Sequence, residues 1–478
     1  MAAETTPMQG FSMEALQLFC RDYKDKINDG MTTIDICEKI VKPETESDNC
    51  SMVDWWVKRK DGINRKLVGR ATIFISHVWK YKFNQLVGLI EKYWRENGQT
   101  QNMFFWYDCF VVNQHIRTVV PYETLKTLFG QSLKNIGKCL VALIDWKKPE
   151  YISRCWCLFE MNTMLSQKID HDIRMTEDDE KSFINQLEKD EQFNFFEGFE
   201  NIKSEKANAT QIDDEKNIKK TISDTIGFHT VDARVYSALR EWFAQTGVRY
   251  LEGKVNKDEK YWIATHNVAD LLDDVGYQMK ALPMFKSCLA WKSKHLGEKN
   301  LSTIWTMNRL GWCLLGLGEF DFENCYFEKC ISVLVSQNKT PNTMANLASC
   351  YLATGKNVEA LDMFTQLHGF MVKKYGKDDP KTLFAVHNIA SCHLNLDHFS
   401  EAAKLFKQCL DSRKLKLGSD HPDTIFSQFK LAVCLMKMGN VNEAKPLYEE
   451  CTNSNSKLFG TGVNATTLWR VASKPPKY

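Results

Sequence analysis

The sequence contains no apolar run long enough to cross a membrane. A membrane-spanning helix needs about 20 consecutive apolar residues, and no stretch of the 478 residues approaches that length. The N-terminus also lacks the basic segment followed by a long apolar segment that marks a secretory signal. We therefore expect a soluble, cytoplasmic protein that has no membrane partner.

The sequence also has almost no net charge. Its 62 Lys and Arg residues nearly balance its 60 Asp and Glu residues, which leaves a formal charge of +2. Proteins that bind nucleic acids usually carry a clear basic excess. The composition therefore gives no reason to expect a nucleic-acid partner.

Several binding motifs are missing as well. The sequence has neither the G-x-x-x-x-G-K-[ST] nor the G-x-G-x-x-G pattern, which argues against a nucleotide-triphosphate motor or switch. Soft metal ligands are present at Cys109, His115, Cys139, Cys155 and Cys157. However, a Cys-x-Cys at a helix start directs its thiols to different faces, and no second Cys-x-x-Cys pair exists. We expect no metal site.

Cysteine itself is abundant, but it is not arranged as a disulfide framework. The 16 cysteines lie inside apolar, periodic segments, as at Cys350 and Cys409. Cysteines used as small buried apolar residues are typical of a reducing compartment.

Residues 70–175 alternate between strand and helix patterns. Short apolar strands are predicted at 71–76, 103–107 and 139–144, with amphipathic helices at 83–94, 122–136 and 151–165. Strands separated by helices of this size form a parallel sheet. We expect a small flavodoxin-like α/β domain here, preceded by a helical cap (1–69) and followed by a helical connector (176–255).

Residues 256–478 form an internal repeat, which is the strongest organisational signal in the chain. A small residue recurs at spacings of 42, 37, 42 and 42 residues, and a large aromatic residue recurs in step with it. The small residues are Ala269, Gly311, Ala348, Ala390 and Ala432, and the aromatic residues are Phe285, Phe327, Phe364, Phe406 and Tyr448. Small residues let paired helices approach closely, so the pattern predicts an all-α solenoid of five helix pairs, capped by a further helix at 464–471.

The segments EAAKLFKQCL (401–410) and LGSDHPDT (417–424) resemble the tetratricopeptide repeats of kinesin light chains. The resemblance implies a right-handed solenoid that binds a protein or peptide partner in its groove. Polar residues recur in the first helices of the repeats, and we name as groove candidates Asn267, Asn308, Asn346, His387 and Asn388. Hydrogen bonding between helices is the alternative role for each of them.

Residues 70–170 carry a second resemblance. The segments ATIFISHVW (71–79), MFFWYD (103–108), CLVALID (139–145) and YISRCWCLFEM (151–161) occur in the order found in Toll/interleukin receptor (TIR) domains. The region thus resembles a TIR domain, although His77-Val78-Trp79 and the loop Asn113-Gln114-His115 depart from the usual pattern. The resemblance implies self-association and, in enzymatic members, cleavage of NAD at the nicotinamide–ribose bond.

By position, the resemblance makes Glu160 the catalytic carboxylate, with NAD as a substrate and no other cofactor. Ser76 and Asp108 end predicted parallel strands, so they are expected at the same edge of the sheet, where open α/β sheets bind ligands. The substrate-binding candidates are Ser76, Trp79, Trp106, Asp108 and Arg154. Trp156 and Cys157 share a helix face with Glu160, and we expect them to be packing residues.

Two functions remain open at this point. The protein is either a signalling NAD hydrolase whose repeats bind a partner, or a non-catalytic adaptor whose TIR-like domain only assembles. A cleft beside Glu160, Trp79 and Asp108 favours the enzyme, whereas a filled cleft favours the adaptor. A true kinesin light chain is disfavoured, because no long heptad segment precedes the repeats.

Overall fold

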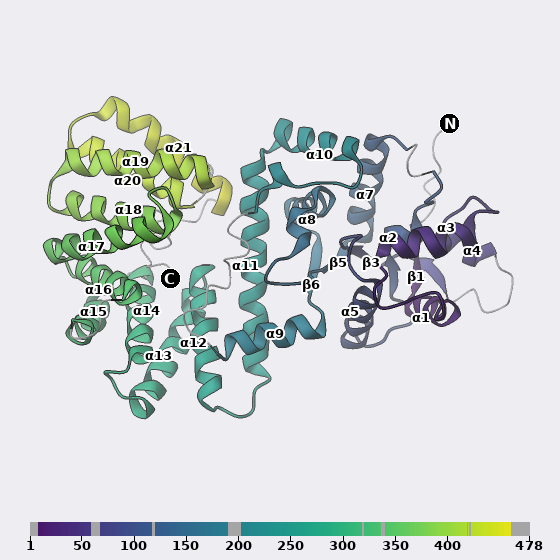
Figure 1. The fold of residues 1–478 in the computed structure, drawn as a ribbon, viewed down its shortest axis with the longest axis horizontal. Helices are drawn as coiled ribbons and strands as arrows, with labels where there is room; N and C mark the ends of the chain where they lie inside the picture. The colour runs from purple at the N-terminus through teal and green to yellow at the C-terminus, as the bar shows by residue number, and fades with distance from the viewer. Residues whose placement is uncertain are drawn as a thin grey trace. The chain divides into compact units, whose positions relative to one another are not determined.

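The structure is a computed structural model that describes residues 8–58, 67–116, 120–189, 202–317, 320–335, 340–417, 419 and 422–459. The chain divides into two compact units (Figure 1). The first unit comprises Met1–Phe183 with Glu197–Val235, and the second comprises Ile184–Phe196 with Tyr236–Tyr478. The expected connector is therefore shared between the two units.

A mixed sheet organises the first unit. Within the described residues its strands are β1 (Gln9–Ser12), β2 (Val68–Arg70), β3 (Ile73–Ser76), β4 (Phe104–Trp106), β5 (Lys138–Ala142) and β6 (Asp170–Arg174). They lie in the order β2-β1-β4-β3-β5-β6. The four strands β4, β3, β5 and β6 are parallel, and β1 is antiparallel to both β2 and β4.

The helices of the first unit surround this sheet. They are α1 (Met13–Asp22), α2 (Thr33–Ile36), the π-helix η1 (Cys37–Val41), α3 (Lys42–Thr45), α4 (Met52–Lys58), α5 (Phe83–Glu96), α6 (Asp108–Val111), α7 (Tyr122–Ile136), the 3-10 helices η4 (Glu150–Ser153) and η5 (Ser204–Lys206), α8 (Cys155–Gln167) and α10 (Ile212–Thr225). Helices α9 (Glu177–Leu187) and α11 (Phe228–Glu252) have residues in both units. Helix α5 buries Phe83, Leu86 and Ile90 along one face, as its amphipathic sequence predicts.

The N-terminal segment differs from the expected helical cap. Strand β1 pairs with β4 at Phe11 and Phe105, so this segment completes the sheet and makes it mixed. The Phe11 ring is fully buried and lies 5.3 Å from the Phe110 ring. The four-residue strand is too short for its alternation to be recognised in the sequence.

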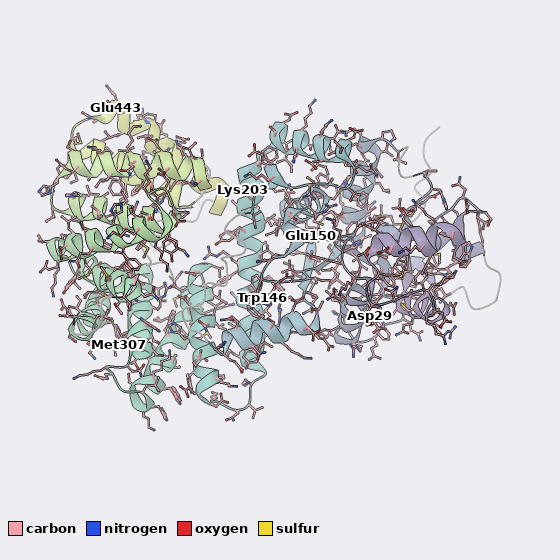
Figure 2. The ribbon with its side chains drawn as sticks, viewed as in Figure 1. Asp29, Trp146, Glu150, Lys203, Met307 and Glu443 are labelled. Atoms are coloured by element: carbon pink, nitrogen blue, oxygen red, sulfur yellow. The ribbon has the colours of Figure 1, made fainter. Side chains whose placement is uncertain are left out.

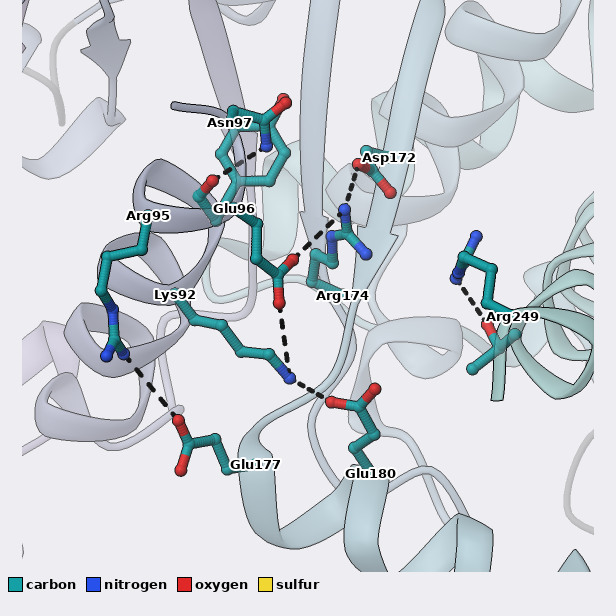
Figure 3. Close-up of polar contacts among 11 residues, drawn as sticks. Lys92, Arg95, Glu96, Asn97, Asp172, Arg174, Glu177, Glu180 and Arg249 are labelled. Atoms are coloured by element: carbon teal, nitrogen blue, oxygen red, sulfur yellow. Dashed lines mark hydrogen bonds and ion pairs between the residues drawn. The ribbon is translucent and has the colours of Figure 1, made fainter. Parts of the chain in front are cut away.

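The first part of the expected connector packs on the first unit. Trp146, labelled in Figure 2, is buried with its ring 5.3 Å from that of Phe183 in α9. Figure 3 shows a network of charges over the same region, in which Arg174 of β6 lies 3.5 Å from Glu96 and Lys92 contacts Glu180. The buried ring contact and the ion pairs from Lys92 and Arg95 of α5 to Glu180 and Glu177 of α9 together attach α9 to the first unit.

The second unit is a stack of helix pairs. Its helices within the described residues are α12 (Glu259–Asp274), α13 (Gln278–His295), α14 (Leu301–Leu317), α15 (Phe320–Leu334), α16 (Pro341–Ala353), α17 (Asn357–Tyr375), α18 (Pro380–Asn395), α19 (Phe399–Leu417), α20 (Pro422–Lys437) and α21 (Val441–Phe459). Each helix contacts the next one along the chain. The predicted capping helix at 464–471 lies outside the described residues.

Two helices of the array begin with a capping side chain followed by proline. Thr340 accepts a hydrogen bond from the Thr343 amide and precedes Pro341, and Asp379 caps α18 in the same way before Pro380. A capping side chain satisfies an otherwise unpaired amide, and proline suits the first helical position.

The recurring small and aromatic residues form the core of the array. All five small residues are buried, and so are four of the five aromatic residues, whereas Tyr448 in the last described pair is 44% exposed. At Gly311 the fit is closest, because a Cβ atom there would lie 2.8 Å from the Phe327 ring. The pattern in the sequence therefore reports real helix-to-helix packing.

We predict that Gly311→Ala lowers the midpoint of thermal unfolding. Overpacking a buried site costs about 1–3 kcal/mol, which outweighs the gain of roughly 1 kcal/mol from the better helix propensity of alanine. Gly369→Ala in α17 is the matched control, because nothing lies within 4 Å of its added Cβ. The control is expected to raise the midpoint, and equal shifts of one sign in both variants would contradict the packing argument.

Candidate functional site

A cleft of about 540 Å³ lies in the first unit, beside the carboxyl ends of β3 and β4. This volume is within the range of small-molecule sites. The walls come from η1, the segment after β3, the start of α6, and helices α7, α8 and α10. Helix α7 lines it with Tyr122, Leu125 and Phe129, which share one face.

Glu160 of α8 lines this cleft, and a buried hydrogen bond fixes its carboxylate. It is 6% exposed and accepts a hydrogen bond from the Ser76 hydroxyl at the end of β3. The Tyr151 hydroxyl lies 2.6 Å from Ser76 Oγ. Because Ser76 gives its single hydrogen to Glu160, Tyr151 is the donor in the second bond.

Tyr151 is suited to this donor role. Burial is the main cause that raises its pKa well above the usual tyrosine value, and Cys157 and Glu160 raise it further. The phenol therefore stays protonated at neutral pH. The hydrogen bonds run from Tyr151 to Ser76 to Glu160, and they fix the carboxylate at the cleft wall.

A second carboxylate, Asp108, lines the cleft at the start of α6. Its Oδ2 accepts a hydrogen bond of 2.8 Å from Trp79 Nε1, and its Oδ1 lies 3.9 Å from His77 Nε2. Both Trp79 and His77 also line the cleft. The segment after β3 and the start of α6 thus form one connected side of the site.

Helix α10 also lines the cleft. Its Asp214 Oδ2 accepts a hydrogen bond of 3.0 Å from Trp156 Nε1, and Asp213 and Asn217 also line the cleft. The ring of Trp156 lies 5.1 Å from that of Phe129 in α7. Trp156 therefore joins α7, α8 and α10 at the site.

Arg154 fastens the segment before α10 to α8. Its guanidinium donates to Asn208 Oδ1 and, at 2.8 Å, to Thr210 Oγ1. The backbones are also joined, since the Cys155 amide donates to the Asn208 carbonyl over 3.0 Å. Glu150, four residues before Arg154, lies 3.5 Å from Lys80.

The structure brings together most of the predicted site residues. Glu160, Trp79, Asp108 and Arg154 line the same cleft. Ser76 is fully buried behind Glu160, so it contacts the carboxylate rather than the cleft.

Trp106, a substrate-binding candidate from the sequence, does not line the cleft. Its ring stacks on Phe74 at 4.5 Å and lies 5.4 Å from Phe129, which places it in the core behind the cleft wall. The strand is covered on both faces, so its apolar sequence could not indicate which rings reach a ligand.

Tyr151 and helix α10 contribute to the site without a signal in the sequence that indicates it. Tyr151 belongs to the quoted motif, but its spacing gives no sign that it contacts Ser76. Asp213 and Asp214 occur in a polar segment that was predicted to be a connector, where acidic residues are usually solvated. Trp156 was expected to be a packing residue, yet it lines the cleft as well.

A second hollow of about 630 Å³ is weaker as a site. Its described lining has lysines, one glutamate and small or aliphatic residues but no aromatic side chain. Glu150 and Lys203, both labelled in Figure 2, are two of its residues. Among the described residues, no group of three or more His, Cys, Asp or Glu side chains is placed to hold a metal ion.

The candidate groove residues of the array are mostly interior. Asn267 donates to the Leu187 carbonyl at 2.9 Å, Asn308 to Cys350 Sγ at 3.0 Å, and Asn388 to the Phe384 carbonyl at 3.0 Å. His387 is buried with its ring 4.9 Å from that of Phe406. Only Asn346 among the five is half-buried.

These placements correct the groove expectation for four of the five residues. Side chains that are fully buried within the array act through hydrogen bonds and packing there. The alternative role, hydrogen bonding between or within helices, fits them better than direct contact with a peptide.

None of the described helices combines the length and the apolar composition that a membrane span requires.

Comparison with known proteins identifies the repeats. Family models described as tetratricopeptide repeat match residues 339–415 and 426–457, which confirms that prediction for these residues. No curated protein matches the chain by sequence.

Solved structures with similarity to the chain include kinesin-light-chain-like repeats. A putative kinesin light chain of Podosopora anserina with nearly identical TPR-like repeats is 21% identical, with 41% of this chain and 95% of that chain covered and a TM-score of 0.31. BtubC (BKLC) from P. vanneervenii is 14% identical, with 48% of this chain and 92% of that chain covered and a TM-score of 0.32.

We predict that Asn267→Ala destabilises the array, because it leaves the buried Leu187 carbonyl without its donor. The loss is expected to be about 1–3 kcal/mol and to appear as a lower midpoint of thermal unfolding. Asn346→Ala is the control, and its effect is expected to stay within about 0.5 kcal/mol. A larger loss for Asn346→Ala than for Asn267→Ala would refute the interior role.

Proposed function

We propose that the protein is a tetratricopeptide scaffold whose first unit is a TIR-like enzyme that hydrolyses NAD at the nicotinamide–ribose bond. The scaffold part follows from the repeats, which typically bind protein or peptide partners. The enzymatic part is supported mainly by one observation: Glu160 lines a cleft of ligand size together with Trp79 and Asp108.

The sheet supports the same proposal. Numbered along the chain, the four parallel strands have the spatial order 2-1-3-4, as in the first four strands of flavodoxin-like folds. In such sheets ligands bind beyond the carboxyl ends of the strands. Ser76 ends β3, and Asp108 follows β4 after one residue, so both lie at that edge.

The proposed chemistry needs a fixed carboxylate next to the ribose. Cleavage of the nicotinamide–ribose bond builds positive charge on the ribose, as in the oxocarbenium-like transition state of glycosidases. Glu160 would stabilise this charge and accept hydrogen bonds from the ribose hydroxyls. Ser76 and Tyr151 hold the carboxylate in place, so little reorganisation is needed when the charge develops.

The remaining residues have distinct roles in the proposal. Trp79 and Trp156 provide aromatic surfaces for the planar rings of the substrate. Arg154 supplies positive charge for the pyrophosphate. Self-association through the first unit, brought about by partner binding to the repeats, is the proposed trigger of a signalling response.

An adaptor without catalysis is the second candidate. It is favoured by the burial of Glu160 and by its hydrogen bond to Ser76, because a buried, paired carboxylate also occurs as a purely structural feature. In that case the first unit only assembles, and the repeats carry the function.

We expect the purified full chain at high concentration to consume NAD and release nicotinamide, measured by chromatography. Glu160→Gln should lower the rate by at least about 10²-fold, because the charge that stabilises the transition state is removed. Glu46→Gln, at an exposed position outside the cleft, is the control and should keep full activity. No turnover by the wild-type chain, even when clustered on a surface, would favour the adaptor.

Ser76 and Tyr151 are predicted to act as positioning residues. Ser76→Ala should lower kcat with little change in KM, because Ser76 contacts Glu160 and not the cleft. Tyr151→Phe should have a smaller effect, since it keeps the hydrogen bond between Ser76 and Glu160. Steady-state kinetics test both variants, and a rise in KM at constant kcat would show direct substrate contact instead.

A further inference from the structure

Two tryptophans of the cleft share an arrangement that the proposed chemistry does not require. Trp79 donates its indole N–H to Asp108, and Trp156 donates its indole N–H to Asp214. The four residues come from four different parts of the fold, yet all line the same cleft. Each hydrogen bond fixes an indole ring and brings a carboxylate to its edge.

A carboxylate bound to an indole N–H makes the ring a better partner for a cation. The face of an indole already carries negative potential and attracts cations within about 6 Å of the ring centre. A negative charge on the hydrogen-bonded edge adds to this potential. Such an arrangement favours a positively charged ligand over a neutral one of the same shape.

The overall charge of the cleft points the same way. Its described lining has five carboxylates, from Glu38, Asp108, Glu160, Asp213 and Asp214. The basic residues of the same lining are His77, Lys42 and Arg154. Lys42 is paired with Glu38 at 2.6 Å, and His77 lies 3.9 Å from Asp108. The described lining thus has more carboxylates than basic side chains.

An organic cation fits these observations better than a metal ion. Among the described residues, no three His, Cys, Asp or Glu side chains are placed to hold a metal ion, which needs several ligands at about 2 Å. The lining of the cleft, about 540 Å³ in volume, also includes aromatic rings. Clefts with aromatic walls and acidic groups are used for quaternary ammonium ligands. The flat surfaces of two indoles further favour a planar cation.

We propose that this cleft binds a planar organic cation, a pyridinium alkylated or glycosylated at its ring nitrogen, and that Asp214 of α10 selects for its positive charge. Where the ligand is NAD, the inference rests on the proposed function, and the cation is the oxidised nicotinamide ring. The binding preference itself does not require turnover.

The test uses the full chain and two ring compounds that differ mainly in charge. 1-Methylnicotinamide is a pyridinium cation, and nicotinamide is its neutral counterpart. Isothermal titration calorimetry is expected to show at least about fivefold tighter binding of the cation. Equal affinities, or no binding of either compound, would overturn the proposal.

Asp214→Asn tests the role of α10 directly. The amide oxygen of asparagine can still accept the Trp156 N–H, so the ring keeps its position while the charge is lost. The variant should bind 1-methylnicotinamide about threefold to tenfold more weakly and nicotinamide unchanged. Asp224→Asn, exposed on the same helix and outside the cleft lining, is the control. An equal loss for both ring compounds would assign Asp214 a structural role and overturn its role in charge selection.

The results separate this proposal from the proposed function. Preference for the cation without NAD turnover upholds the binding site and contradicts the hydrolase. NAD turnover without preference for the cation upholds the hydrolase and overturns the selection by charge.

Discussion

The first unit depends on the hydrogen bonds that stabilise one buried carboxylate, that of Glu160. Moving a charged group out of water is costly unless it is hydrogen-bonded, and Glu160 is 6% exposed. The Ser76 hydroxyl offsets this cost at the end of β3, and Tyr151 completes the line of hydrogen bonds. The strand, the 3-10 turn before α8 and α8 itself are thereby joined at the point where the cleft begins.

The repeat array manages buried polar groups in another way. His266, Lys292 and Thr306 form one cluster, in which Lys292 Nζ donates to Thr306 Oγ1 over 2.9 Å. The same arrangement recurs 121 residues later, with His387, Arg413 and Ser427 in the corresponding positions. There Arg413 donates to Ser427 Oγ at 2.7 Å, beside His387. Burial first, and then Arg413 and Lys430, lower the pKa of His387 well below its usual value, so it remains neutral. Recurring polar residues thus join successive repeats, which explains why most groove candidates lie inside.

The sequence predicted regular features well and short or polar ones poorly. The expected helix at 122–136 agrees with α7, because its apolar spacing and the following Gly137, with a φ of 75°, are strong signals. Strand β1 has only four residues, and its partner residues are distant in the sequence. The sequence motif is enough to indicate Glu160 as a site residue. Its contact with Ser76 is not predictable in this way, because only the folded chain brings α8 and the end of β3 together.

Helix α10 shows why the rest of the site could not be predicted. It buries only Ile218 and Ile222 among its side chains, so its sequence resembles that of a solvated linker. Those two residues pack inward, the Tyr122 hydroxyl lies 3.1 Å from Thr221 Oγ1, and the acidic first turn lines the cleft next to Trp156. Because α10 lies outside the sheet, its carboxylates can change without disturbing the hydrogen bonds that hold Glu160. The fold therefore separates Glu160, which is fixed by hydrogen bonds from the core, from the carboxylates of α10, which are carried by a helix outside the sheet.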